Sequence, residues 1–296
     1  MTVSEVETAY AKINLALHVR GRMDGGYHAI ETLFAFVDDG DRLSAAIADT
    51  MSLRVTGPFA SSLDGDGHDN LVMRAAHSMA ERFAPGRAAA LSLDKHLPVA
   101  SGIGGGSADA AAAIRLLDRL WGLDRPLQDY VALAASLGAD VPACLFSRTA
   151  LGTGRGDDVA FEEIDGLAQA HILLVNPGIG VSTAQIFQRW TGRDGGALTQ
   201  RSLAALFGEA RNDLQEPAIA LVPDIGALLE HLRQFSPSAR MSGSGATCFA
   251  LFKSDRDVVA AQAAIADRHP GYWTMTARMR PFACADASPA SERAAT

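Results

Sequence analysis

Alternation of apolar and polar residues near the start of the chain predicts a strand that buries one face. The apolar residues of segment 11–19 recur at every second position, which is the period of a β-strand. Lys12 and Asn14 fall between them and therefore share the opposite face. A turn signal, DGG at 24–26, precedes a second apolar run at 30–37, so we predict a β-hairpin.

Apolar residues spaced three or four positions apart predict helices over 70–83, 107–121 and 126–137. The polar, glycine-rich segment 61–70 is expected to be a loop that leads into the first of these helices. Gly138 is a stop signal after the third.

The second half of the chain has the same mixture of strands and helices. We predict a buried strand at 170–178, a helix that begins within 182–190, and a glycine turn that leads into an apolar strand at 241–252. A charged, glycine-rich break at 152–158 separates the halves and indicates a two-domain α/β (α+β) protein. The predicted division is an N-terminal domain at 1–155, a C-terminal domain at 156–285 and a disordered tail at 286–296.

Composition narrows the class of partner. The chain has 296 residues, 48% of them hydrophobic, and a formal net charge of −8. It can form sizeable cores, but it has too little positive charge to bind nucleic acid or an anionic membrane non-specifically. The N-terminus lacks a signal-peptide pattern and no apolar run could span a bilayer, so we expect a cytoplasmic protein. Cys144, Cys248 and Cys284 are far apart, which favours free thiols over disulfides or a zinc site.

A cluster of glycines precedes the predicted helix at 107–121. The loop reads SGIGGGS over 101–107. Unpaired N–H groups and the helix dipole attract anions to a helix N-terminus, and glycines let phosphate oxygens approach the backbone. We interpret the loop as a phosphate cradle, and the alternative is a tight connection without a ligand. The loop lacks the lysine of a Walker A motif and, at Ser107, the last glycine of a dinucleotide fingerprint.

Three segments together resemble the motifs of the GHMP kinase family, which includes galactokinase, homoserine kinase and mevalonate kinase. The glycine loop, within PVASGIGGGSADAA from Pro98, is similar to the second motif. AKINLALHV at 11–19 is similar to the first motif, and MSGSGATCFALF at 241–252 is similar to the third. The resemblance implies a two-domain GHMP kinase fold with the active site in the cleft between the domains. It also implies ATP and Mg²⁺ as cofactors.

The resemblance extends over most of the chain and narrows the substrate. Family members that act on a cytidine diphosphate compound have segments similar to AKINLALHVRGRMDGGYHAIETLF, LGADVPACLF, VNPGIGVSTAQIF and RNDLQEPA. The implied reaction is ATP-dependent phosphorylation of the 2-hydroxyl of 4-diphosphocytidyl-2-C-methyl-D-erythritol, which gives the 2-phosphate and ADP in the methylerythritol phosphate route to isoprenoid precursors. The alternatives are a GHMP kinase acting on another small alcohol and a non-catalytic sensor of ATP and a metabolite. We expect a monomer or a weak homodimer.

The resemblance assigns catalysis to Lys12 and Asp140. Asp140 would accept the proton of the substrate hydroxyl, and Lys12 would keep that carboxylate ionised and polarise the oxygen. Transfer would be direct, without a phosphoenzyme. The alternative for Lys12 is a solvated strand lysine. For Asp140 it is a helix N-cap, because Gly138 ends one helix and Pro142 stands in the first turn of the next.

Substrate recognition is expected from residues that follow the DGG turn. At Tyr27 and His28 a ring can stack on a base, while an imidazole or the exposed backbone can read the edge of a pyrimidine. The base implied by the resemblance is cytosine, in a small-molecule substrate that carries a CDP group. Further substrate contacts implied by the resemblance are Asn14, Thr183, Phe187, Gly243, Ser244 and Gly245. For Phe187 the alternative is a core position, and for Gly243 to Gly245 it is an ordinary glycine turn.

By the same resemblance, the glycine loop and two residues outside it bind ATP. The predicted contacts are Pro98, Val99, Ala100, Ser101, Gly102, Ile103, Gly104, Gly105, Gly106, Ser107, Asn70 and Lys95. Ser107 is also a candidate magnesium ligand, although we expect ATP to carry most of the metal's ligands. Asp109 lies in the first helical turn, where its charge would repel phosphates unless it turns away or recruits magnesium.

Overall fold

The structure, a computed structural model, describes residues 4–63 and 70–282, and its strands form two sheets. The strands are β1 (Ser4–Arg22), β2 (His28–Ala48), β3 (Ser52–Thr56), β4 (Ala88–Asp94), β5 (Ala150–Thr153), β6 (Asp158–Phe161), β7 (His171–Asn176), β8 (Arg240–Met241), β9 (Cys248–Phe252) and β10 (Trp273–Arg278). The first sheet has the order β3-β4-β2-β5-β6, with β1 paired to β2. The second has the order β10-β7-β9-β8. The pairs are antiparallel except β3 with β4, which is parallel.

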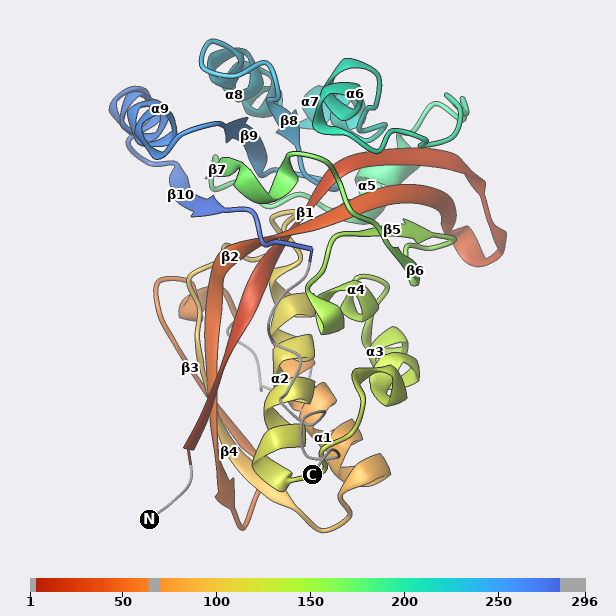
Figure 1. Cartoon of the computed structure of the whole chain (residues 1–296), viewed down its shortest axis with the longest axis vertical. Coiled ribbons are helices and arrows are strands. Elements are labelled where there is room, and N and C mark those ends of the chain that lie inside the picture. The colour runs from red at the N-terminus through yellow and green to blue at the C-terminus, as the bar shows by residue number, and fades with distance from the viewer. Residues whose placement is uncertain (1–3, 64–69, 283–296) are drawn as a thin grey trace, which may run out of the picture.

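The helices divide between the two sheets. They are α1 (Leu71–Phe83), α2 (Gly105–Trp121), α3 (Val131–Leu137), α4 (Val141–Phe146), α5 (Thr183–Gln188), α6 (Leu203–Gly208), α7 (Gln215–Leu221), α8 (Pro223–Arg233) and α9 (Asp255–Arg268). In the lower half of Figure 1, α1 to α4 lie beside the first sheet, and in the upper half α5 to α9 accompany the second. The predicted mixed α/β architecture is confirmed.

The predicted hairpin of β1 and β2 is confirmed, and it is longer than the apolar pattern suggested. Its two strands run from the lower half of the molecule into the upper half (Figure 1). The pairing shifts register at three points, including those between Tyr10 and Lys12 and between Asn14 and Ala16. Such irregularities bend a strand and re-aim its side chains. They occur on either side of Lys12 and Asn14, the two polar residues of the first motif.

Three apolar clusters hold these elements together. The first packs α1 and α2 on the sheet of β2 and β4, and the second lies among β7, β9, α8 and α9. The third includes Ile13 and Leu33 of the hairpin together with Ile172 and Phe249 of the second sheet. Each side chain of this size contributes about 1.5–3 kcal/mol when it is fully buried. The third cluster therefore fixes the hairpin, which carries the first motif, against the second half of the molecule.

The other predicted elements agree with the structure in most places. The helices predicted at 70–83 and 107–121 and the strands at 170–178 and 241–252 are present. The helix predicted at 126–137 is only partly correct, because Leu127–Tyr130 forms a 3₁₀ turn before α3 begins. Pro126, which is extended, starts this turn by accepting a bond from the amide of Asp129.

Some predictions fall on parts of the chain outside the described residues. These are most of the loop predicted at 61–70, the tail at 286–296 and the thiol of Cys284. Cys144 and Cys248 are buried free thiols, as predicted. The predicted domain boundary at 155 falls in the turn between the paired strands β5 and β6, and the domain limits stay a prediction.

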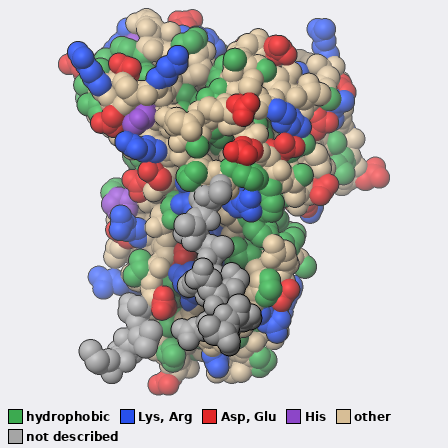
Figure 2. Space-filling view, in the orientation of Figure 1, with side chains coloured by type: hydrophobic (Ala, Val, Ile, Leu, Met, Phe, Trp, Pro, Cys, Tyr) green, Lys and Arg blue, Asp and Glu red, His purple; other side chains and the backbone are tan. Residues whose placement is uncertain are grey.

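The described part of the chain contains no helix that is both long enough and apolar enough to cross a membrane. Acidic and basic side chains are interspersed across the face in Figure 2, where neither sign forms a large patch outside the grey atoms.

Candidate active site

A cavity of about 730 Å³ lies where the three sequence motifs meet. It is lined by the start of α2, the middle of β1, the DGG turn, α5 and the glycine turn after β8. The predicted site residues that line it are Lys12, Asn14, Tyr27, His28, Ala100, Ser101, Gly102, Gly104, Gly105, Gly106, Ser107, Asp140, Thr183, Phe187, Gly243 and Ser244. Residues from distant parts of the sequence therefore form one pocket, and their contacts with a ligand stay a prediction.

The glycine loop presents free backbone amides to this cavity. Gly104 is the N-cap residue of α2, so no side chain caps the helix. Gly105, Gly106 and Ser107 form the first turn and line the cavity. Their N–H groups have no partner within the helix, and the 17-residue helix directs the positive end of its dipole toward the cavity. This arrangement suits a phosphate group.

Hydrogen bonds connect the three motifs. The amide of Asn14 donates to Oγ of Ser242 at 3.1 Å, and this hydroxyl donates to the carbonyl of Gly102 at 2.9 Å. The amide of Lys12 donates to the carbonyl of Ile103 at 3.1 Å. The strand of the first motif and the turn of the third therefore both hold the glycine loop in position.

Two glycines of the loop permit this close approach. A Cβ on Gly102 would lie 2.4 Å from the carbonyl oxygen of Ser242, and one on Gly104 would lie 2.7 Å from Cε of Lys12. Both glycines also have positive φ, at 80° and 62°. A larger residue would displace either the third motif or the Lys12 side chain.

Lys12 and Asp140 form an ion pair at the edge of the cavity. Nζ of Lys12 lies 2.8 Å from Oδ2 of Asp140 and donates to Oδ1 of Asn14 at 2.9 Å. The lysine side chain is 3% exposed, whereas that of Asp140 is 35% exposed. Asp140 does occupy the N-cap position of α4, but its side chain makes no capping bond. The carboxylate therefore remains available to the cavity, beside a fixed ammonium group.

Aromatic and imidazole rings form the other end of the cavity. The rings of His28 and Phe187 lie 4.9 Å apart, and Trp190, which does not itself line this cavity, packs edge-on against His28 at 5.7 Å. Tyr27 is 56% exposed, and the guanidinium group of Arg155 lies 5.3 Å from its ring. Tyr27 and Phe187 line the cavity and offer ring faces on which a planar base can stack, whereas His28 and Phe187 are too close together to admit a ring between them.

His28 is suited to reading an uncharged base. Burial, together with the nearby charge of Arg22, lowers its pKa, so the ring is neutral near pH 7. Its Nε2 is buried and has no hydrogen-bond partner in the described part of the chain. A neutral imidazole nitrogen in this state can pair with a ligand group.

The third motif reaches the cavity through Gly243 and the hydroxyl group of Ser244. Oγ1 of Thr183 lies 2.8 Å from Oγ of Ser244, and Gly243 lines the wall beside them. Ser182 caps α5 and thereby fixes the start of the helix that carries Phe187. The Thr183–Ser244 contact joins α5 to the glycine turn.

Six predicted contacts do not line the cavity, and their contact with a ligand stays a prediction. They are Asn70, Lys95, Pro98, Val99, Ile103 and Gly245. The Asn70 side chain caps α1 by accepting a bond from the amide of Val72 at 2.9 Å. Gly245 supports the third motif from behind, since its amide donates to the carbonyl of Ser242.

Lys95 points beneath the glycine loop rather than into the cavity. Its ammonium group bonds Oδ2 of both Asp41 and Asp109, and all three side chains are buried. Burial raises the pKa of Asp109 to about 7, although the charge of Lys95 opposes this shift. Asp109 therefore points away from the cavity. The sequence predicts that it either turns away from the phosphates or recruits magnesium, and the structure shows the first of these.

Four residues that shape this region have no role assigned from the sequence. They are Asp41, Arg155, Trp190 and Ser242. Two of them lay in segments that carried a signal, Ser242 in the third motif at 241–252 and Arg155 in the charged glycine break at 152–158. Asp41 and Trp190 stand in ordinary strand and helix patterns.

Comparison with known proteins agrees with this geometry. Residues 70–148 match the family model "GHMP kinases N terminal domain", and residues 197–271 match "GHMP kinases C terminal". A crystal structure of homoserine kinase from Cytophaga hutchinsonii has the same fold, with a TM-score of 0.72 at 18% identity over 94% of this chain and 96% of that one. The fold and the site therefore define a small-molecule kinase of the GHMP class.

Relatives with higher identity narrow this class. A 4-diphosphocytidyl-2-C-methyl-D-erythritol kinase from Rhizorhabdus wittichii is 49% identical over 93% of this chain and 94% of its own. One from Novosphingobium aromaticivorans is 49% identical over 93% and 92%. A crystal structure of 4-(cytidine 5'-diphospho)-2C-methyl-D-erythritol kinase has a TM-score of 0.77 at 30% identity, over 92% of this chain and 99% of that one. The chain belongs to the GHMP kinase family, in the group of 4-diphosphocytidyl-2-C-methyl-D-erythritol kinases, as its motifs predicted.

Proposed function

We propose that this kinase transfers the γ-phosphoryl group of ATP to the 2-hydroxyl of 4-diphosphocytidyl-2-C-methyl-D-erythritol. The observation that carries the proposal is the Lys12–Asp140 pair, with N···O at 2.8 Å, in the same cavity as the uncapped start of α2. The uncapped start of α2 can bind a triphosphate. The carboxylate of Asp140, at the edge of the cavity, can accept a hydrogen bond from a substrate hydroxyl group. The relatives named above carry the same activity in their names.

The geometry supports a direct, in-line transfer. The amides of Gly105, Gly106 and Ser107 hold the phosphates of ATP, and the ammonium group of Lys12 stabilises charge on the oxygens between donor and acceptor. Asp140 orients the substrate hydroxyl and accepts its proton as the new O–P bond forms. The bond to the β-phosphate oxygen breaks in the same step, and ADP leaves.

Magnesium fits this site as a partner of ATP. The described residues contain no group of three or more His, Cys, Asp or Glu side chains that could hold a metal ion. The Ser107 hydroxyl and the Asp140 carboxylate line the cavity, and oxygen groups of this kind complete the shell of a Mg²⁺ that retains waters and phosphate ligands. The ion would neutralise phosphate charge.

Base selection rests on Tyr27, His28 and Phe187. The neutral His28 ring, with a free Nε2, faces Phe187 at 4.9 Å. Cytosine would stack on the cavity side of the Tyr27 and Phe187 rings while its edge pairs with His28, and Thr183 and Ser244 would lie near the attached diphosphate. A simple polyol would leave this end of the cavity without a ligand.

The test is to measure ADP release with three acceptors, which are the full CDP-bearing alcohol, the free methylerythritol and homoserine. We expect turnover of the first, inhibition by CDP that is competitive with it, and at least a hundredfold lower kcat/KM for the other two. Efficient turnover of a free alcohol without inhibition by CDP would favour a kinase for another small alcohol. ATP binding without ADP release for any acceptor would indicate a sensor.

We further propose that the enzyme is cytoplasmic and works as a monomer or a weak homodimer, without nucleic acid or membrane. The buried free thiols Cys144 and Cys248 support a reducing compartment. The net charge of −8 and the mixed charges of the surface support the absence of polyanionic partners. Light scattering across a concentration series would measure the oligomeric state.

A further inference from the structure

A second cavity, of about 720 Å³, lies in the upper half of the molecule beside the active site. It is bounded by the residues after α5, the segment 210–217 before and within α7, and the ends of α6 and α8. None of its lining residues lines the active-site cavity. Its volume is in the range of sites for small molecules.

Arginine dominates the charge of this cavity. Arg193, Arg211, Arg233 and Arg240 line it, whereas its carboxylates are those of Asp213 and Glu216. The whole chain has a net charge of −8, so this local excess of positive charge is opposite in sign to the charge of the protein as a whole.

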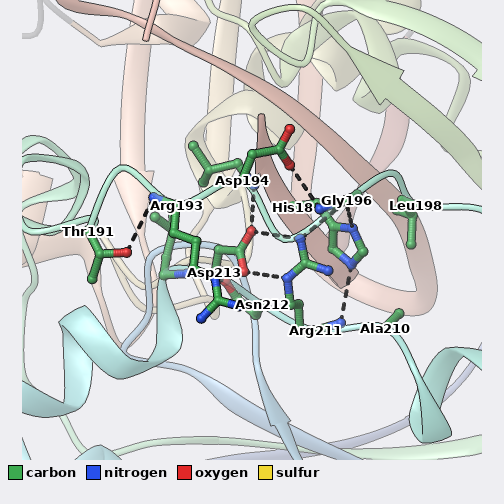
Figure 3. A network of polar contacts seen from close by, with 12 residues as sticks. His18, Thr191, Arg193, Asp194, Gly196, Leu198, Ala210, Arg211, Asn212 and Asp213 are labelled. Carbon is green, nitrogen blue, oxygen red and sulfur yellow. Dashed lines mark hydrogen bonds and ion pairs between the residues drawn. The ribbon is translucent and has the colours of Figure 1, made fainter. Parts of the chain in front are cut away.

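One of the arginines is neutralised within the protein. Arg211 binds both carboxylate oxygens of Asp213, at 2.6 and 3.3 Å, and its amide donates to Nε2 of His18 (Figure 3). His18 must therefore donate from Nδ1 to the carbonyl of Gly196, at 3.0 Å. Burial and the charge of Arg211 lower the pKa of His18, so the ring adds no positive charge near pH 7. Arg211 and its partners form a rigid wall rather than a ligand-binding group.

The other three arginines have no carboxylate partner in the described part of the chain. Arg193 and Arg233 are exposed, and neither forms an ion pair. Glu216 is the remaining carboxylate that lines the cavity. Three cations therefore face one acidic group.

Arg240 is the deepest of the three. It is 8% exposed, and three of its N–H groups donate to the carbonyls of Leu15, Leu206 and Ala210. The guanidinium also lies over the ring of Phe207, 5.0 Å from its centroid, and its other two N–H groups have no hydrogen-bond partner among the described residues. Burial, together with the charge of Arg233, lowers the pKa of Arg240 to about 10. An anion would offset this cost, because it would supply the missing opposite charge.

We propose that this second cavity is a binding site for a small polyanion, such as a phosphorylated or diphosphate-bearing metabolite, held by Arg193, Arg233 and Arg240. Guanidinium groups bind phosphate oxygens through paired N–H donors, which gives both strength and orientation. The buried Arg240 supplies a fixed anchor, and the two exposed arginines supply further N–H donors from the cavity wall.

The test uses inorganic pyrophosphate as the probe. It is titrated calorimetrically into the full-length enzyme, whose active site is first saturated with a non-hydrolysable ATP analogue and CDP. Arg240→Met is unsuitable as the main variant, because three backbone carbonyls would lose their donor. The informative variant is Arg193→Gln with Arg233→Gln, since both side chains are exposed.

We expect the wild-type enzyme to bind pyrophosphate and the double variant to bind it at least tenfold more weakly. The matched control is Arg74→Gln with Arg82→Gln, two exposed arginines of α1 with the same change in net charge, which should bind like the wild type. Equal weakening in both double variants would show non-specific attraction and overturn the proposal. Absence of binding to the blocked wild-type enzyme would overturn it as well.

Discussion

Two lysines approach the glycine loop from opposite sides, and each pairs with aspartate, but only one pair opens on the cavity. Lys12 lies against Gly104 and pairs with Asp140, whose side chain is 35% exposed. Lys95 lies against Gly105 and pairs with Asp41 and Asp109, which are 0% and 4% exposed. The lysines themselves are equally buried. Exposure of the carboxylate, rather than burial of the lysine, separates a pair that can meet a substrate from one that cannot.

The sealed cluster performs a different task. Asp41 accepts bonds from the amides of His96 and Leu97 with its second oxygen, Oδ1, so it ties the segment before the loop to β2. Asp109 lies just after the first turn of α2 and is tied to the same ammonium group. Lys95 therefore joins β2, the approach to the loop, and the helix that follows it. We interpret it as a group that positions the loop.

The largest expected effect is on the open pair. Asp140→Asn should lower kcat by about 10²–10⁴-fold, the usual contribution of a positioned acid or base, because the amide cannot accept the hydroxyl proton. Stability should change little, since the carboxylate is partly solvated. ADP release and thermal unfolding would be measured together. A loss below tenfold with an unaltered pH–rate profile would leave Asp140 as an orienting group only.

The second effect is on the sealed cluster. Lys95→Met should lower the free energy of unfolding by about 3–5 kcal/mol, because two buried carboxylates lose their shared cation. Denaturant titration would measure this change, and kcat per folded molecule should fall much less than in Asp140→Asn. Lys12→Met is the matched control. It should lower kcat more than Lys95→Met does, and lower the free energy of unfolding less. A fully stable Lys95→Met enzyme with a hundredfold lower kcat would instead place Lys95 in contact with the nucleotide.

The contrast between the two pairs also shows how far sequence analysis reaches. Local patterns predicted the hairpin, α2 and the glycine loop, because period and glycine spacing act over a few residues. Lys12 and Asp140 were paired through family resemblance, and the structure places them 2.8 Å apart. The direction of Lys95 could not be predicted, since its partner Asp41 is 54 residues away in another strand. Asn70 carried a local signal, that of an N-cap before a helix.

The third prediction compares the two glycines that face the lysines. Gly104→Ala should destabilise the enzyme by about 1–2 kcal/mol, the cost of a left-handed Ala, and should lower kcat because its Cβ would lie 2.7 Å from Cε of Lys12. Gly105→Ala is the matched variant, since Gly105 has helical geometry and its Cβ would lie 3.0 Å from Nζ of Lys95. Its kcat should fall less. Equal loss of kcat in both variants would contradict the assignment of catalysis to the Lys12 pair and of loop positioning to the Lys95 cluster.

The smallest effect is a pH dependence of stability that arises in the sealed cluster. Burial, together with the charge of Asp41, raises the pKa of Asp109 from the ordinary 3.8 to about 7, although the charge of Lys95 opposes this shift. The folded chain then holds a proton that the unfolded chain has lost, so the contribution of Asp109 to stability is complete below pH 3.8 and disappears as pH rises through 7.

Asp109→Asn removes this titration and leaves Lys95 with Asp41 as a single pair. The difference in unfolding free energy between wild type and variant should therefore slope by up to about 1.4 kcal/mol per pH unit between pH 5 and 7, in the direction that favours the variant as pH rises. Denaturant titrations at several pH values would measure it. Asp140→Asn serves as the comparison, since its carboxylate is open to solvent. A flat difference for Asp109→Asn would mean that Lys95 keeps both of its carboxylates ionised, and that the sealed cluster carries a net negative charge directly beneath the phosphate loop.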